Sequence, residues 1–298
     1  MSETEWIKRH IVPLVTAKGA DGLRDDVAVL SGDGVMIASM DTLIEGVHFL
    51  KSDPVMMVGR KLVRVNVSDI LAKGALPHEA LLSIAWPRGW VEDDFAALMR
   101  GIGLDLNGFG ISLIGGDTVG TEGPLSLTMT LTGRCLGAGP VRRGGGKAGD
   151  QLWISGEIGW GRLGLEAALS GGDVTVAKKY RVPEIGDLAA ASVVCDLATA
   201  SIDVSDGLLI DALRLGEASG CGAVIVLDAV PLARASDDIE SVLEQCTGGD
   251  DYKILLAASA GVAVPEFTRI GELVSQPGLS LRYKGERVNA PVTLGFEH

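Results

Sequence analysis

The sequence SLIGGDT at Ser112–Thr118 shows the pattern from which the fold of this chain can be predicted. Apolar residues at Ile111, Leu113 and Ile114 are typical of a buried strand, and the run ends in two glycines and a carboxylate. Because glycine has no side-chain bulk, a phosphate group can approach the backbone N–H groups there closely. We expect Asp117 at the end of this strand, where α/β architectures usually place their chemistry.

Apolar segments that end in acids recur along the chain, at 36–41, 62–69 and 201–206, whereas Asp25 and Asp26 precede an apolar run. Any single case is typical of an aspartate in a turn or at a helix cap, since these residues often neighbour glycine. Six such clusters in a chain with few compensating basic residues indicate instead hard cations bound by oxygen ligands. The clusters are Asp25–Asp26, Asp41, Asp69, Asp117, Asp203–Asp206 and Gly248–Asp251.

Composition limits the class of protein and its partners. A chain of 298 residues is expected to form about two domains, and 47% hydrophobic residues with 41 glycines indicate a packed, turn-rich globular protein. The net charge of −13 argues against nucleic acid as a partner, because no basic stripe is present to neutralise a phosphate backbone. An acidic protein can still bind polyphosphate when divalent metals mediate the contact.

The cysteines and the N-terminal sequence indicate a reducing compartment. Four scattered cysteines without a CxxC pair are expected to be small core residues, not a disulfide framework or a zinc site. Residues 1–10 lack the apolar core of a signal peptide, and no apolar stretch reaches the ~18 residues that span a bilayer. We therefore expect a cytoplasmic protein with no membrane partner.

The first half of the chain is expected to alternate strands and helices. Asp53 and Pro54 are suited to the cap and first position of a helix that reaches Ala72, although the β-rich run Leu62–Val67 leaves a strand as the alternative. The other expected elements are two strands within 27–50 joined by a turn at 31–34, a strand at 81–86, a helix at 92–107 and a strand at 125–133.

A glycine-rich break at 140–149 separates the halves, so the predicted domains are 1–138 and 139–298. The second half is expected to contain strands at 151–155 and 223–227 and helices at 187–200, 207–218 and 237–246. The sequence at 159–164 matches GxGxxG after a strand, but no returning strand with an acidic end follows, which disfavours a dinucleotide site. No GxxxxGK[ST] loop is present, so ATP use would be of another class.

Taken in order, the acidic motifs resemble those of thiamine-monophosphate kinases, a family of the aminoimidazole ribonucleotide synthetase superfamily. The resemblance covers nearly the whole chain, and the ordered set is specific to the kinase, although single motifs are shared across the superfamily. The motifs are Asp25-Asp26, Asp41-Thr42, Asn66–Asp69, Gly115–Thr118, Asp203–Gly207, Gly248–Tyr252, the segment Gly46–Phe49 and the closing Gly295–His298.

This resemblance implies an α+β fold of two domains, an N-terminal α/β ATP-binding domain that pairs with its twin in a homodimer and a C-terminal α+β domain. It implies ATP-dependent phosphorylation of thiamine phosphate to thiamine diphosphate with several Mg²⁺ ions. The implied metal ligands are Asp26, Ser39, Met40 through its backbone, Asp41, Asp69, Asp117, Asp203 and Asp206. The implied ATP contacts are Gly116, Asp117, Arg143 and Ser205, and the implied thiamine contacts are His48, Asp250 and Phe296.

No catalytic side chain is expected, because the attacking phosphate oxygen is already ionised at neutral pH. The chain departs from the family pattern at Arg24 for a glycine, Met40 for a threonine, Asp250 for the glutamate of GGED and Phe296 for a tyrosine. One alternative is another enzyme of the superfamily, but those with a reactive N-terminal or C-terminal cysteine do not fit this sequence, whose first cysteine is Cys135. A non-catalytic metal or nucleotide sensor is the second alternative.

Overall fold

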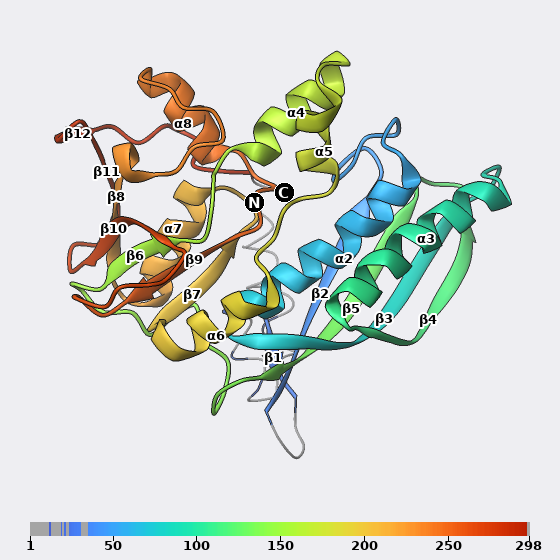
Figure 1. The fold of residues 1–298 in the computed structure, drawn as a ribbon, viewed down its shortest axis with the longest axis horizontal. Coiled ribbons are helices and arrows are strands. Elements are labelled where there is room, and N and C mark those ends of the chain that lie inside the picture. The colour runs from blue at the N-terminus through green and yellow to red at the C-terminus, as the bar shows by residue number, and fades with distance from the viewer. Residues whose placement is uncertain (1–11, 13–18, 20, 22–23, 31–34, 297–298) are drawn as a thin grey trace.

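Two β-sheets, one in each half of the chain, organise the residues that the computed structural model describes, which are 12, 19, 21, 24–30 and 35–296 (Figure 1). The first sheet has the strand order β1-β2-β5-β3-β4. Strands β3 and β4 run parallel, and the other neighbours run antiparallel. The strands are β1 (Ala28–Val29), β2 (Met36–Ile44), β3 (Ala75–Pro87), β4 (Ser112–Thr121) and β5 (Ser126–Cys135).

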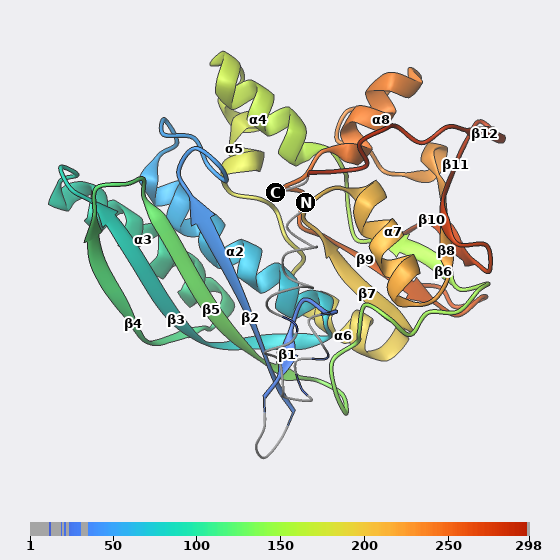
Figure 2. The same ribbon diagram turned by 180° about the vertical axis from the view of Figure 1, so that it is seen from behind.

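Helices α2 (Val55–Ala72) and α3 (Glu92–Phe109) cover one face of this sheet. Figure 2 shows the opposite face, on which no helix of the described residues lies. Helix α3 buries Leu98 and Ile102 and ends at Gly110, whose φ of 69° is left-handed and therefore favours glycine. As far as the described residues go, helices thus cover one face of the first sheet and leave the other face open.

The second sheet has seven strands in the order β12-β11-β8-β10-β6-β9-β7. Strands β8 and β11 pair in parallel, whereas the other neighbouring strands pair antiparallel. The strands are β6 (Gln151–Ile154), β7 (Ala200–Val204), β8 (Gly222–Val226), β9 (Lys253–Ala258), β10 (Thr268–Val274), β11 (Gly278–Tyr283) and β12 (Glu286–Val288).

The helices of the second half pack around this sheet. A core that includes Ile202, Leu208 and Leu255 joins α7 and α8 to it, which explains the apolar pattern predicted for these segments. The helical elements are α4 (Trp160–Ser170), α5 (Val174–Arg181), α6 (Leu188–Leu197), α7 (Leu208–Ala218), the short 3-10 helix η4 (Leu227–Ala229) and α8 (Ile239–Thr247).

Helix α2 lies between the two halves of the molecule and is buried on most of its surface. It contacts β2 and β5 on one side and α6, β7 and β9 on the other, and 12 of its 18 residues are buried. A helix that is buried on most of its surface carries apolar residues on all sides. The β-branched residues Val63, Val65 and Val67 are therefore compatible with this helix, because all three are buried. The strand alternative for Leu62–Val67 is therefore wrong, and the helix ends at Ala72 as predicted.

Asp53 does not cap helix α2, and this part of the prediction is wrong. Its side chain makes no capping hydrogen bond; it accepts the N–H of Leu50 at 2.8 Å and pairs with Arg181 of α5 at 2.6 Å. With its side chain 2% exposed, the carboxylate is satisfied by this ion pair. Asp53 thus connects the start of α2 to the second half of the chain.

Two strands continue past the acidic residues that were predicted to end them. Asp41 lies in the middle of β2 and Asp117 in the middle of β4, because both runs continue their pairing beyond the aspartate. Strand β4 is also exposed from Ser112 to Gly120, so the prediction of a buried strand is wrong. Its apolar residues lie on an edge strand of a sheet with one open face, and they are exposed there.

The two-domain α+β fold class is confirmed, whereas the boundary between residues 138 and 139 stays a prediction. The strand predicted at 81–86 is longer than expected, because β3 begins at Ala75, and the other predicted strands and helices are present within a few residues of their expected bounds. The predicted turn at 31–34 and the closing residues 297–298 lie outside the described residues. In the part of the chain that is described, no helix is long and apolar enough to cross a membrane.

Candidate functional site

A polar cavity of about 210 Å³ lies where the two halves meet. Strand β2 and helix α2 contribute side chains from the first half, and β7, the loop after it and α7 contribute from the second. The lining residues are Asp26, Ser39, Met40, Asp41, Asp69, Arg143, Ile202, Asp203, Ser205, Asp206, Asp211 and Arg214. Five of the predicted aspartates, which are distant along the chain, therefore line one cavity together with Arg143 and Ser205.

Hydrogen bonds at the cavity wall join helix α2 to a strand of each sheet. Ser39 of β2 donates to Asp69 of α2, and Ser68 of α2 donates to Asp203 of β7 at 2.9 Å. Ser68 and Asp69 are consecutive on the helix, so α2 contacts both sheets from adjacent positions. The NVSD motif at 66–69 is thus explained by its place between the sheets.

Asp117 does not reach this cavity in its own chain. Along the sheet Asp41 pairs with Met129, Met129 with Leu82, and Leu82 with Gly116, so β4 lies three strands, or about 14 Å, from β2. Asp117 follows Gly116 and pairs with Ser83, so its side chain points to the open face, whereas Asp41 points to the helices. The structure of one chain therefore separates Asp117 from the other acids.

Gly116 has a steric reason to be glycine that differs from the predicted approach of a phosphate. A Cβ atom at this position would lie 1.8 Å from the carbonyl oxygen of Leu82 on the neighbouring strand. Pairing of β3 with β4 therefore excludes any side chain at Gly116. The predicted contact of Gly116 with ATP is not required to explain this residue.

Burial and mutual repulsion raise the pKa values of the acids that face the cavity. Burial, then the charge of Asp206, raises the pKa of Asp41 to about 6. Burial, then Asp211, raises the pKa of Asp203 to about 7. For Asp69, burial followed by the charges of Asp41 and Asp203 raises the pKa well above its ordinary value. Such a cluster is unfavourable without cations, so its electrostatics favour the binding of positive charge.

Basic side chains already contact several of these acids. Arg143 pairs with Asp26, and the buried Lys73 contacts Asp26 as well. Arg214 contacts both Asp206 and Asp211. The Nε atom of Arg143 is buried and has no hydrogen-bond acceptor among the described residues, which is costly and leaves a donor for an anion such as a phosphate oxygen.

Sequence reasoning missed Lys73, Asp211 and Arg214. Asp211 and Arg214 lie one and two turns into the helix that follows the DVSDG motif, a spacing that places them on one face of α7. This helical spacing from Asp206 and Gly207 could have identified both. Lys73 directly follows α2, and only the tertiary structure shows that it turns back to the acids.

The donor set suits Mg²⁺, although it is not a complete metal cage. All the candidate ligands are oxygen donors, which hard cations prefer. Among the described residues, no three His, Cys, Asp or Glu side chains converge closely enough to hold a metal ion by themselves. Mg²⁺ commonly takes one or two carboxylates and completes its coordination with water and substrate phosphates, and the cavity matches that pattern.

Two of the three predicted thiamine contacts, Asp250 and Phe296, lie on segments that are hydrogen-bonded to the loop that lines the cavity. The N–H of Asp250 donates to the carbonyl of Ser205 at 2.8 Å, and that of Phe296 donates to the carbonyl of Asp206 at 2.9 Å. His48 lies in the turn after β2, where its Nδ1 accepts the N–H of Ile44 at 3.0 Å. The Phe296 side chain is half exposed, so its ring is accessible beside the acids.

Lys61 of α2 joins two of these segments. The side chain is 1% exposed, and its Nζ donates to Asp250 at 2.9 Å and to the carbonyl of His48 at 2.9 Å. It also lies 4.0 Å from the ring centre of Tyr180, a favourable cation–π distance. Asp250 has a left-handed φ of 68° and accepts a second hydrogen bond from Tyr252. A buried cation therefore fixes the Asp250 carboxylate against the His48 turn.

The glycines at 159–164 serve close packing, not a dinucleotide. Asp251 accepts the N–H groups of Gly159 and Gly161 at 2.7 and 2.9 Å. A Cβ atom at Gly161 would lie 2.1 Å from the carbonyl oxygen of Gly249. The start of α4 is thus held against the 248–251 loop, which accounts for this GxGxxG match.

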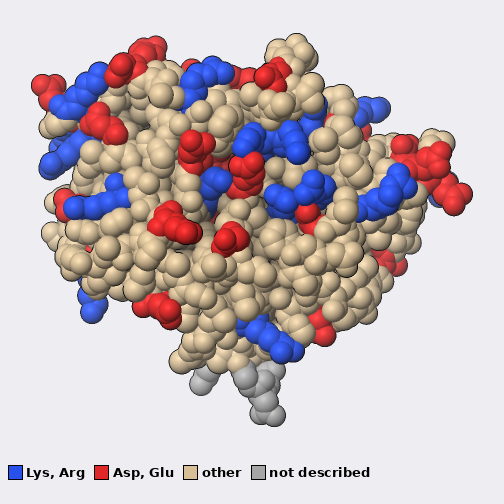
Figure 3. All heavy atoms as spheres, in the orientation of Figure 1, with Lys and Arg blue, Asp and Glu red and all other residues tan. Residues whose placement is uncertain are grey.

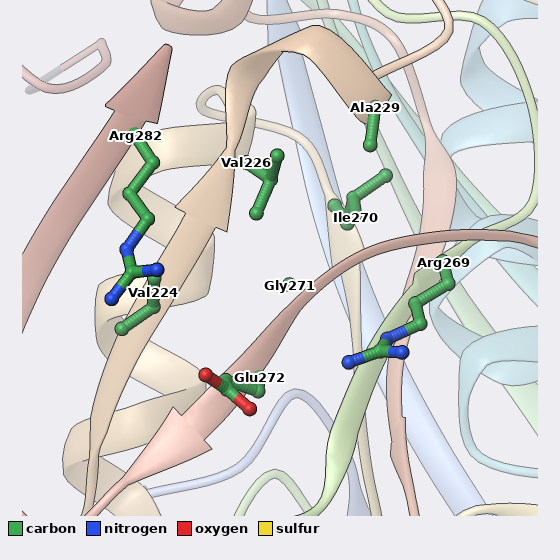
Figure 4. A pocket seen from close by; sticks show the side chains of 8 residues that line it. All are labelled: Val224, Val226, Ala229, Arg269, Ile270, Gly271, Glu272 and Arg282. Atoms are coloured by element: carbon green, nitrogen blue, oxygen red, sulfur yellow. The ribbon is translucent and has the colours of Figure 1, made fainter. Parts of the chain in front are cut away.

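A second hollow, of about 250 Å³, lies on the second sheet over β8 and β10 (Figure 4). Arg269, Glu272 and Arg282 surround an apolar floor there, and none of the predicted site residues lines it. On the face of the molecule in Figure 3, acidic and basic side chains are interspersed. The predicted residues therefore single out the polar cavity.

We predict that the metal-free protein loses stability as pH rises from 5 to 8. Carboxyl groups with raised pKa values, about 6 for Asp41 and Asp211 and about 7 for Asp203 and Asp251, stay protonated in the fold after the unfolded chain has lost those protons. Their contribution is fully present below pH ~4 and is lost through pH 6–7. Thermal unfolding in a chelator should show a fall of about 5 °C or more.

Saturating Mg²⁺ with a non-hydrolysable ATP analogue is the control, and it should flatten this pH dependence because bound cations stabilise the ionised acids. An unfolding temperature that rises over the same range would show that the acids are not forced together in the fold.

Comparison with known proteins gives a consistent result. Residues 24–135 match the family described as AIR synthase related protein, N-terminal domain, and residues 147–284 match its C-terminal domain. A thiamine-monophosphate kinase of Caulobacter vibrioides is 37% identical over 100% of this chain and 91% of its own length. One from Escherichia coli K12 is 32% identical over 93% of this chain and 91% of its own. A solved structure described as AaThiL complexed with AMPPCP and TMP has a TM-score of 0.81 and 26% identity, covering 95% of this chain and 99% of that one.

Proposed function

Because this chain belongs to the thiamine-monophosphate kinase family, we propose that it transfers a phosphoryl group from ATP to thiamine phosphate, forming thiamine diphosphate. The observation that carries this proposal is the cavity in which acids from both halves of the chain face Arg143 and Ser205. The similar structure that holds AMPPCP and TMP supports the same pair of substrates.

The acids address the main obstacle to this reaction, which is repulsion between two anions. At an effective dielectric of about 20, like unit charges about 4 Å apart repel by ~4 kcal/mol, and the two substrates bring several such charges together. Bound Mg²⁺ would supply the positive charge that offsets this repulsion. The residues that would hold it are Asp26, Ser39, the carbonyl of Met40, Asp41, Asp69, Asp203 and Asp206.

The remaining residues position the substrates. Arg143, with its unpaired buried Nε, and Ser205 would bind phosphate groups of ATP. His48, Asp250 and Phe296 would hold thiamine phosphate, since the latter two are hydrogen-bonded to the cavity loop itself. The attacking phosphate oxygen is ionised at neutral pH, so direct in-line transfer needs no side chain to remove a proton.

A homodimer completes this proposal, because Asp117 is remote from the cavity of its own chain. The open face and free edge of the first sheet carry exposed apolar side chains at Met40, Leu81, Leu113, Ile114 and Val119. Unpaired edge strands and apolar patches are typical of association surfaces. Pairing of two copies through this surface would bring Asp117 and Gly116 of one copy to the cavity of the other, on the side of Met40.

The direct test is turnover by the purified protein. Incubation with ATP, Mg²⁺ and thiamine phosphate should yield thiamine diphosphate and ADP in equal amounts, measured by chromatography. Removal of Mg²⁺ by a chelator should abolish product formation, and its return should restore the rate, because the repulsion is then unscreened. Full turnover in the chelator would contradict the role given to the acids.

Nucleotide binding without any phosphoryl transfer would instead favour a non-catalytic sensor, which is the alternative to an enzyme.

A cytoplasmic location stays a prediction from the sequence.

A further inference from the structure

Arg214 of α7 lines the polar cavity, although no sequence motif marked it. Its Nη1 atom contacts both Asp206 and Asp211, the latter at 2.9 Å. The Asp211 side chain is 1% exposed and also accepts the N–H groups of Asp206 and Gly207 at 3.1 and 3.2 Å. The guanidinium is therefore anchored to a carboxylate that the backbone itself holds in place.

The edge of this guanidinium that carries Nε and Nη2 remains available for a ligand. Within the described part of the chain, Nε and Nη2 of Arg214 make no hydrogen bond, and the side chain is 35% exposed. Two parallel N–H groups on a planar cation match two oxygens of a phosphate group. Arg214 thus presents a bidentate donor at the wall of the cavity.

The position of Arg214 has opposite consequences for cations and anions. Its charge next to Asp206 offsets the repulsion that Asp206 exerts on Asp41, so it weakens the attraction of these acids for a metal ion. The same charge strengthens the attraction of the cavity for an anion. A neutral side chain at this position would produce neither effect.

We propose that Arg214 is a phosphate-binding residue of the nucleotide site, and that it neutralises Asp206 until metal and nucleotide bind together. This inference rests on the proposed function, because it takes the polar cavity as the nucleotide site. Asp206 would then be available to hold a metal ion, while Asp211 would keep the Arg214 guanidinium directed at the phosphate.

The test compares two binding constants in Arg214→Gln. Titration calorimetry of the nucleotide-free variant should show Mg²⁺ binding about 3- to 10-fold tighter than in the unaltered protein, because the competing cation is gone. Binding of AMPPCP at saturating Mg²⁺ should weaken about 10-fold or more, because a charged hydrogen-bond donor is lost. In Arg214→Lys, Mg²⁺ affinity should stay near that of the unaltered protein, and AMPPCP affinity should be intermediate.

Arg60→Gln is the matched control, since Arg60 pairs with Asp105 between α2 and α3, outside the cavity. Both constants should be unchanged in it, and circular dichroism should confirm that all three variants are folded. Shifts of the two constants in the same direction, or no shift in either, would overturn the role of Arg214. If the unaltered protein binds AMPPCP but forms no thiamine diphosphate, the proposed acceptor is wrong, while opposite shifts in Arg214→Gln still support this role.

Discussion

Asp41→Asn should lower kcat for thiamine diphosphate formation by about 10²- to 10³-fold, a loss of ~3–4 kcal/mol of transition-state stabilisation. Asp41 faces the cavity from β2, opposite the acids of β7 and α7. The amide keeps the shape of the side chain and removes a negative charge that would hold Mg²⁺ against the two phosphate groups. A coupled assay for ADP together with chromatography of the thiamine products measures this effect.

The same substitution should stabilise the metal-free protein. Burial and the charge of Asp206 raise the pKa of Asp41 to about 6, so the ionised side chain destabilises the fold at pH 8. Removing that charge is expected to raise the unfolding temperature by about 2–6 °C, for a gain of ~1–2 kcal/mol. A variant that is both inactive and less stable would indicate a damaged fold instead of a lost metal ligand.

Asp228→Asn is the control for the Asp41 experiment. Asp228 lies outside the cavity, where its carboxylate accepts the N–H of Lys284 at 2.6 Å. Its loss should leave kcat unchanged, because it faces neither substrate. A comparable loss of rate there would mean that the assay reports general sensitivity to charge.

A heterodimer of one Asp117→Asn chain and one Asp41→Asn chain should regain about half the activity of the unaltered dimer, although each variant alone is inactive. Asp117 lies three strands from Asp41 and points to the opposite face of the sheet. If each cavity uses the partner's Asp117, one of the two sites in this heterodimer has both aspartates, and the other has neither. Co-expression with two different affinity tags isolates the heterodimer.

The alternative arrangement gives a different result in this experiment. Were Asp117 to act within its own chain, each site of the heterodimer would lack one aspartate, and the activity would stay at the level of the single variants. Sedimentation should first show that the 31.0 kDa chain is dimeric. A monomer with full activity would remove the basis for any contribution from a second copy.

The acids that meet at the cavity could be predicted, but the local reasons for their positions could not. Acidic motifs in a fixed order identify Asp26, Asp41, Asp69 and Asp203 as one set, and the structure brings them together. A rule that places acids at strand ends fails for Asp41, in the middle of a strand, and for Asp69, on a helix. Convergence here depends on how α2 packs between two sheets, which short-range patterns do not encode.

Charge compensation was the part least accessible from the sequence. Lys73 contacts Asp26, which is distant in the sequence, and no local motif indicates this pair, whereas only a helical spacing links Arg214 to Asp206 and Asp211. Asp53 illustrates the same limit, because its position before proline indicated a cap whereas Arg181, 128 residues away, determines its role. Propensities describe neighbours along the chain, and ion pairs depend on neighbours in space.

The ion pair between Lys61 and Asp250 limits how the proposed site could change its acceptor substrate. Its ammonium group belongs to the first half of the chain, yet it holds Asp250 of the second half against the turn at His48. Replacing Asp250 alone would leave the buried Lys61 ammonium without its carboxylate partner, which is costly. A change of acceptor substrate through Asp250 would therefore require a paired substitution at Lys61. We expect the two halves of the chain to change together in sequence, and not to be interchangeable between related proteins.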